Sequence, residues 1–165
     1  MKKIIVLSSI TLLALLFSVN VFSQKNSEFG SEDQKLVTSK ALDYIEGWFE
    51  GDPDRMKSCL HPDLAKRSIY TNPKTGRSVV AFHSASTLVE STRMGNGKKY
   101  PKDKRDIKIS ILHMNRGIAS VKITCLLMTE YLHLVKYNGE WAIINVLFEM
   151  NPKEDVEKIL KSNSN

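Results

Sequence analysis

The dipeptide Asn138-Gly139 separates two long runs, residues 130–137 and 141–149, that are rich in β-branched and aromatic side chains. Asn-Gly is the preferred centre of a type I′ turn, whose twist matches that of two antiparallel strands. Side chains along a strand alternate between the two faces of a sheet. This part of the chain is therefore predicted to form a long β-hairpin.

The two-residue turn also sets which residues lie opposite one another. Counting outward from it pairs Leu132 with Asn145 and places Asn145 on the same face as Trp141, the face that we assign to the helices. The other face carries Tyr131, His133, Val135, Ala142, Ile144 and Val146. An antiparallel sheet usually leaves one face in water, and large apolar patches mark interaction sites. We therefore expect this second face to form a homodimer interface.

Helical signals dominate the chain before this hairpin. Residues 31–34 match a capping box, and apolar residues then recur at spacings of three and four until Gly51. Asp52-Pro53 is typical of the N-cap and first residue of a second, short helix. Ser84 is predicted to cap a third helix, which breaks at Gly95.

Strand signals fill the remaining segments. A short hairpin is expected from residues 64–71 and 78–82, joined by turn residues. After Arg105 the apolar period changes to two, which predicts strands at 107–111 and 118–128. Helices followed by an antiparallel meander define the α+β class, and no internal repeat indicates a second domain.

The N-terminus has the features of a secretory signal peptide. Lys2 and Lys3 precede an apolar run at 4–17, and Val21-Phe22-Ser23 offers small residues for cleavage before Gln24. The alternative is an uncleaved anchor, although the run is shorter than the roughly 20 residues of a spanning helix. We expect a signal peptide at 1–23 and a periplasmic or secreted protein, without a membrane span after signal removal. The mature chain then divides into a flexible lead at 24–34, one domain at 35–152 and a charged tail at 153–165.

The net charge of the 165-residue chain is +6, and the excess is local. Basic residues gather in one segment: Lys98, Lys99, Lys102, Lys104 and Arg105. The simplest interpretation is a solvated loop. An anion or nucleic-acid patch is the alternative, but no aromatic stacking platform accompanies it, so no nucleic-acid partner is expected.

The two cysteines, Cys59 and Cys125, both lie in apolar patterns, which favours buried thiols and leaves a disulfide open. The four histidines are scattered and share no ligand spacing with the cysteines. We therefore expect no metal site, and the sequence indicates no cofactor.

Four segments together resemble the putative lumazine-binding family of the NTF2-like superfamily: residues 44–52, 61–67, 88–93 and 131–141. The resemblance implies an NTF2-like cone, in which three N-terminal helices pack on a curved antiparallel sheet. It also implies a pocket at the open end of the cone and frequent dimers. The family name implies pteridine binding, but it is a label for the family rather than for this ligand.

Six residues are candidates to line that pocket: Tyr44, Trp48, Arg67, His83, Trp141 and Asn145. Each has a simpler alternative. Tyr44 and Trp48 are also compatible with core packing, and Arg67 with an outward rim charge. His83 is either an exposed residue or a pocket acid–base group. Asn145 either satisfies backbone groups or contacts a ligand, because a buried amide needs partners.

Catalysis is not supported by these residues. The superfamily includes SnoaL-like and ketosteroid-isomerase-like enzymes, which place a carboxylate base on the strand after the second helix. The corresponding stretch here, 66–70, contains no carboxylate. The sequence thus favours an exported small-molecule-binding protein. The alternatives are a SnoaL-like isomerase, hydrolase or cyclase that uses a pocket His or Tyr, and a pure protein-interaction module.

Overall fold

The computed structural model describes residues 30–162. The predicted signal peptide and residues 24–29 of the lead lie outside this range. Within it, none of the helices has both the length and the hydropathy that crossing a membrane requires.

The chain has the predicted α+β architecture. In the described residues, two helices precede the first strand, a third follows the second strand, and a fourth follows the last strand. The elements are α2 Ser31–Glu50, α3 Pro53–Cys59, β1 Leu60–Thr71, β2 Ser78–His83, α4 Ala85–Arg93, a 3₁₀ turn η1 Lys102–Lys104, β3 Lys108–Asn115, β4 Ile118–Thr124, β5 Met128–Tyr137, β6 Glu140–Met150 and α5 Lys153–Lys161.

The helix caps expected from the sequence are present. The Asp52 side chain accepts hydrogen bonds from the backbone N–H groups of Asp54 and Arg55, at 3.1 and 3.0 Å, and Pro53 is the first residue of α3. The Ser84 hydroxyl accepts from the Thr87 N–H at 3.3 Å. These bonds satisfy N–H groups that have no partner inside the helix.

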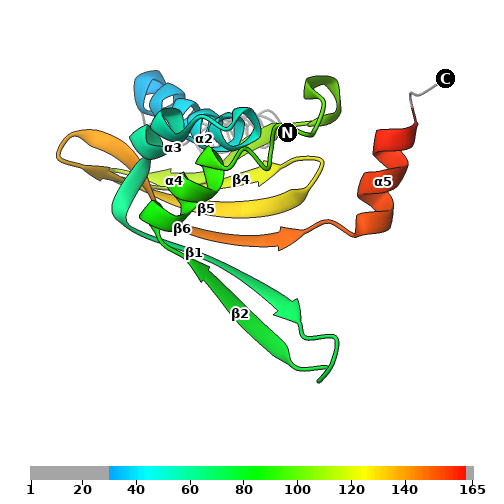
Figure 1. Cartoon of the computed structure of the whole chain (residues 1–165). Helices are drawn as coiled ribbons and strands as arrows, with labels where there is room; N and C mark the ends of the chain where they lie inside the picture. The colour runs from blue at the N-terminus through cyan, green and yellow to red at the C-terminus, as the bar shows by residue number, and fades with distance from the viewer. Residues whose placement is uncertain (1–29, 163–165) are drawn as a thin grey trace, which may run out of the picture. The chain divides into compact units, whose positions relative to one another are not determined.

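The six strands form one curved sheet in the order β2-β1-β6-β5-β4-β3. Neighbouring strands are antiparallel, except that β1 runs parallel to β6. Helices α2, α3 and α4 lie over one face, and the β1–β2 hairpin bends away from the rest of the sheet (Figure 1). We call the helix-covered side the inner face and the opposite side the outer face.

The turn between β5 and β6 has the expected geometry, since Asn138 and Gly139 both have positive φ angles of 51° and 86°. The register predicted from it holds only for the first pairs. Leu134 lies opposite Ile143 as expected, but the next pair is His133 with Asn145. Ile144 is therefore an extra residue in β6, and the strand contains a β-bulge.

The bulge corrects two sequence predictions, because one extra residue reverses the facing of every residue beyond it. Leu132 pairs with Val146 rather than with Asn145. Val146 is fully buried on the inner face, so it is not available for a subunit interface. Asn145 lies beside His133 on the outer face instead of facing the helices.

The loop after α4 contacts α2 through Gly97 and Arg105, while its side chains Lys98, Lys99 and Lys102 are exposed. A Cβ atom at Gly97 would clash with the carbonyl oxygen of Trp48 and would lie 2.7 Å from the Phe49 Cα. The Arg105 guanidinium lies 5.0 Å from the centre of the Phe49 ring and donates a long hydrogen bond to the Phe49 carbonyl, at 3.5 Å. These contacts fix the loop that follows α4.

Substitution of Gly97 by alanine is expected to destabilise the protein by about 3 kcal/mol, because backbone atoms of α2 have no room to move away from the new methyl group. Urea unfolding of the two proteins measures the difference. Gly117→Ala is the control, since its Cβ would meet only Lys136 Cβ, at an ordinary 3.8 Å. Equal stability of both variants would contradict the close approach at Gly97.

Candidate functional site

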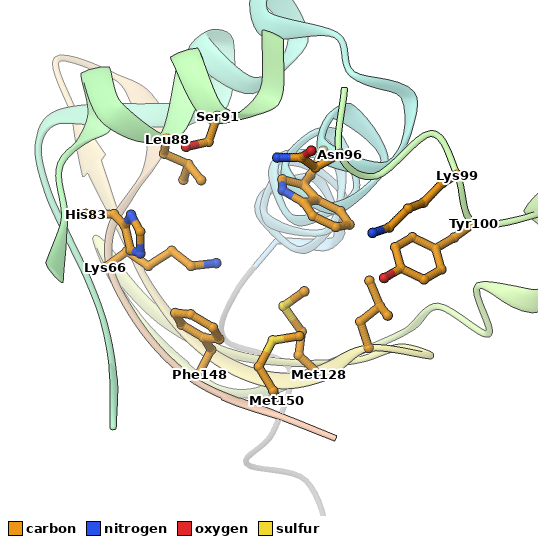
Figure 2. A pocket seen from close by; sticks show the side chains of 12 residues that line it. Lys66, His83, Leu88, Ser91, Asn96, Lys99, Tyr100, Met128, Phe148 and Met150 are labelled. Carbon is orange, nitrogen blue, oxygen red and sulfur yellow. The ribbon is translucent and has the colours of Figure 1, made fainter. Parts of the chain in front are cut away.

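A cavity of about 250 Å³ lies between the inner face of the sheet, helix α4 and the loop after α4. Figure 2 shows residues from each of these parts around it. The residues that line it are Trp48, Lys66, His83, Leu88, Ser91, Asn96, Lys99, Tyr100, Leu127, Met128, Phe148 and Met150. Ligand pockets usually measure about 300–1,000 Å³. This cavity lies just below that range, so it has room only for a small molecule.

Most of the wall is apolar, and its charged side chains are all cationic. Aromatic rings come from three separate elements: Trp48 from α2, Tyr100 from the loop and Phe148 from β6. The ammonium groups belong to Lys66 and Lys99. An apolar wall with a few polar groups is the usual composition of a ligand site.

Lys66 extends from β1 into this cavity, with its ammonium group above the Phe148 ring (Figure 2). Its Nζ atom lies 4.2 Å from the centre of that ring. Only 7% of the residue is exposed. A lysine in so apolar a position needs both a counter-charge and hydrogen-bond acceptors.

Those partners are Glu130 and Tyr44. Lys66 Nζ donates to Glu130 Oε1 and to the Tyr44 hydroxyl, each at 2.5 Å. The Tyr44 hydroxyl in turn donates to Glu130 Oε1 at 2.9 Å. Glu130 is 0% exposed, and its second oxygen, Oε2, has no hydrogen-bond partner among the described residues. The three side chains form a charged cluster, here called the Lys66 triad, behind the cavity wall.

Burial and the neighbouring Glu130 carboxylate raise the pKa of Tyr44 well above its ordinary value, because both disfavour a phenolate. The phenol therefore keeps its proton and acts as the donor to Glu130. Three elements that are distant in sequence, α2, β1 and β5, are joined by this triad.

Trp48 and His83 were both predicted pocket residues, and both line this cavity. The neighbouring candidate Tyr44 lies behind Lys66, with only 2% of its surface exposed. His83 lies opposite Lys66 in the β1–β2 pairing, which brings the two side chains to the same end of the cavity.

The other three pocket candidates lie elsewhere. Arg67 and Asn145 are on the outer face, where Arg67 donates to Asn145 Oδ1 at 3.4 Å and the Asn145 amide meets His133 Nδ1 at 3.1 Å. Trp141 is buried, and its indole N–H donates to Asp33 Oδ1 at 2.8 Å. Together with Lys136, that bond lowers the pKa of Asp33 and ties the first turn of α2 to the sheet.

Sequence analysis missed Glu130 and treated Lys66 only as part of a strand that lacks a carboxylate. The carboxylate comes instead from β5, which pairs with β6 and not with β1. The sequence does contain an indication of this role. In the alternation of β5, Glu130 takes an inward position between Met128 and Leu132. A charged residue at a core position needs a partner elsewhere in the fold.

The two cysteines are free and buried. Burial raises the pKa of Cys59 to about 12 and also raises that of Cys125. Both therefore remain thiols at neutral pH, and Cys59 donates to the Met56 carbonyl at 3.0 Å. Within residues 30–162, no three His, Cys, Asp or Glu side chains are grouped in a way that would hold a metal ion.

Several solved structures share this fold at low sequence identity. An NTF2-like protein of unknown function from Silicibacter pomeroyi superposes with a TM-score of 0.58 at 13% identity, over 73% of this chain and 98% of its own. One from Methylobacillus flagellatus gives 0.55 at 16% identity, over 76% and 97%. A protein of unknown function with a cystatin-like fold from Nostoc punctiforme gives 0.55 at 14%, over 76% and 96%.

These matches show that the chain has the NTF2-like fold, as the resemblance implied. The family model described as "Putative lumazine-binding" matches residues 32–149, and the chain belongs to that family. None of the curated proteins matches the chain. Family and fold together support small-molecule binding in general terms.

Removing one member of the Lys66 triad is expected to cost more stability than removing all of it. Lys66→Met leaves the Glu130 charge buried without a partner, which typically costs about 3–5 kcal/mol. The triple variant Lys66→Met, Glu130→Leu, Tyr44→Phe removes every unpaired group and should recover most of that loss. Urea unfolding of the two variants and the parent checks this order. A triple variant less stable than Lys66→Met would show that the triad is not a charge-paired unit.

Proposed function

We propose that this protein is an exported binding protein that holds a small, planar, anionic molecule in the cavity between the sheet, α4 and the loop after α4. The observation that carries this proposal is the composition of the wall. It has aromatic and apolar side chains on several sides and ammonium groups from Lys66 and Lys99, and none of the described residues that line it is Asp or Glu.

The aromatic side chains favour a flat ligand. Trp48, Tyr100 and Phe148 reach the cavity from different elements, so a ring between them can contact more than one aromatic side chain. Aromatic contacts add about 0.5–1.5 kcal/mol to the free energy of burying apolar area. A planar ligand uses these contacts better than a branched aliphatic one.

The two ammonium groups have different roles in recognising charge. The charge of Lys66 is balanced by Glu130 at 2.5 Å. Lys99 is exposed, and its ammonium group lies 5.3 Å from the centre of the Tyr100 ring, on the opposite side of the cavity from Lys66 (Figure 2). An anionic group on the ligand would therefore pair with Lys99, while the rest of the ligand enters the apolar part.

Export is the second part of the proposal. Its support is the signal-peptide pattern of residues 1–23, where two lysines precede an apolar run and a small-residue cleavage site. The two buried thiols are compatible with an oxidising compartment, because burial keeps them away from partners and oxidants.

The binding proposal is tested with 2-naphthoate and its neutral counterpart 2-naphthamide, followed through calorimetry and tryptophan fluorescence. We expect the carboxylate to bind more tightly than the amide. Lys99→Met should weaken naphthoate binding about fivefold, since an exposed ion pair contributes up to ~1 kcal/mol. The same change should leave naphthamide binding unchanged.

Lys102→Met is the matched control, because Lys102 lies in the same basic segment but does not line the cavity. It should bind both compounds as the parent does. Equal binding of the acid and the amide by the parent would contradict an anionic ligand. Failure of both to bind would contradict the cavity as the site.

We also propose that the outer face pairs two copies of the chain. Five of the six interface residues predicted from the sequence belong to this face, and Val146 does not. Large apolar side chains are exposed on it in neighbouring strands: Ile69, Val80, Phe82, Ile118, Tyr131 and Leu147. An apolar patch that extends over several strands is typical of an interaction surface.

Light scattering is expected to give a dimer for the parent at micromolar concentration. Leu147→Glu should give a monomer, because two copies of the carboxylate would be buried in the interface. Ile159→Glu is the control, since Ile159 is also exposed but lies on α5. A monomeric parent, or a variant Leu147→Glu that remains dimeric, would contradict this interface.

A further inference from the structure

We infer that Lys66 captures carbonyl compounds: its amine forms a reversible imine with an aldehyde or ketone that enters the cavity. This inference rests on the proposed binding cavity but goes beyond reversible, non-covalent binding. It is carried by the Lys66 triad, which places an amine, a carboxylate and a phenol together at an apolar cavity wall.

Imine formation first requires an amine that a carbonyl compound in the cavity can reach, and Lys66 provides it. Among residues 30–162, Lys66 is the only buried lysine, and its ammonium group points into the cavity (Figure 2). Two of its three N–H donors are used by Glu130 and Tyr44. The amine can therefore meet a ligand in the cavity while its orientation stays fixed. Lysines that form imines in proteins are characteristically held in apolar pockets.

Glu130 meets the second requirement, a group that can take the proton of the ammonium. An amine attacks a carbonyl carbon only after it has lost that proton. Glu130 Oε1 is 2.5 Å from Lys66 Nζ, and Glu130 Oε2 is buried without a hydrogen-bond partner in the described part of the chain. Moving one proton from Lys66 to Glu130 replaces two buried charges by two neutral groups, which reduces the desolvation penalty on both.

Tyr44 holds the amine and the carboxylate in place during this transfer. Its hydroxyl is 2.5 Å from Lys66 Nζ and 2.9 Å from Glu130 Oε1. Because the phenol keeps its proton, it does not compete with Glu130 as a base. Tyr44 is thus a positioning residue, whereas Lys66 is the nucleophile and Glu130 the proton carrier.

The reaction balances without an oxidant or reductant. Glu130 takes a proton from the Lys66 ammonium, and the amine nitrogen bonds to the carbonyl carbon. A proton then passes from that nitrogen to the former carbonyl oxygen, which gives a neutral carbinolamine. Glu130 returns its proton to the carbinolamine hydroxyl, which leaves as water while the carbon–nitrogen double bond forms. The sum is one ammonium and one carbonyl group converted to one protonated imine and one water, and hydrolysis reverses it.

The test uses 2-naphthaldehyde with sodium cyanoborohydride, which reduces an imine to a stable secondary amine. Intact mass counts the adducts, and peptide mapping places them. We expect a single early adduct at Lys66 of the folded parent protein. Glu130→Gln should slow this labelling by about 100-fold, the lower limit of what a positioned proton carrier contributes. Lys102→Met should label as the parent does, since Lys102 does not line the cavity.

Lys66→Met should lose the early adduct, but a folding defect would have the same effect. A competition on the unaltered protein avoids that ambiguity. Added 2-naphthoate should suppress labelling of Lys66 by occupying the cavity and leave the slow labelling of exposed lysines unchanged. Labelling confined to exposed lysines, or an adduct at Lys66 that forms as fast in Glu130→Gln, would overturn the inference. If naphthoate still binds in that case, the binding proposal stands and only the imine chemistry fails.

Discussion

The extra residue in β6 decides which side chains reach the cavity. Ile144 has no partner of its own in β5, so residues beyond it face the opposite way from a regular continuation of the hairpin. Phe148 and Met150 point inward for that reason, and they form the floor of the cavity beside Lys66. A regular strand would have turned the Phe148 ring outward and away from the Lys66 ammonium, which lies 4.2 Å from the ring centre.

The Lys66 triad links this floor to the helices. A buried ion pair is rarely a net source of stability, because desolvation offsets most of the attraction between the charges. Its presence at the edge of a cavity therefore needs another explanation. Glu130 balances the lysine charge, and the cationic character of the cavity is left to Lys99 at the opposite side. The proposed recognition of an anion and the proposed amine chemistry both depend on this separation of the two lysines.

The sequence was sufficient for most of the fold and for part of the site. Caps at Asp52 and Ser84 and the turn at Asn138-Gly139 are local, and the local residues determine them. Trp48 was a pocket candidate because helix periodicity turns it towards the sheet, whereas His83 was a candidate only for its side-chain chemistry and lines the cavity from the end of β2. The bulge at Ile144 was not predictable, because no glycine or proline marks it. The partnership of Lys66 with Glu130 was missed because it joins strands that are not adjacent in the sheet.

The parallel pairing of β1 with β6 joins the β1–β2 hairpin to the rest of the sheet, and it affects how far the hairpin can move. Lys66 and His83 belong to the bent β1–β2 hairpin, whereas Glu130 belongs to the main part of the sheet, so the ion pair crosses this junction. A guest that pushes the hairpin outward must stretch the contact between two opposite charges in an apolar setting. The work of separation grows with distance in such a medium far more than it does in water. Separation of Lys66 from Glu130 would therefore oppose the entry of an oversized guest, in addition to its contacts with the cavity wall.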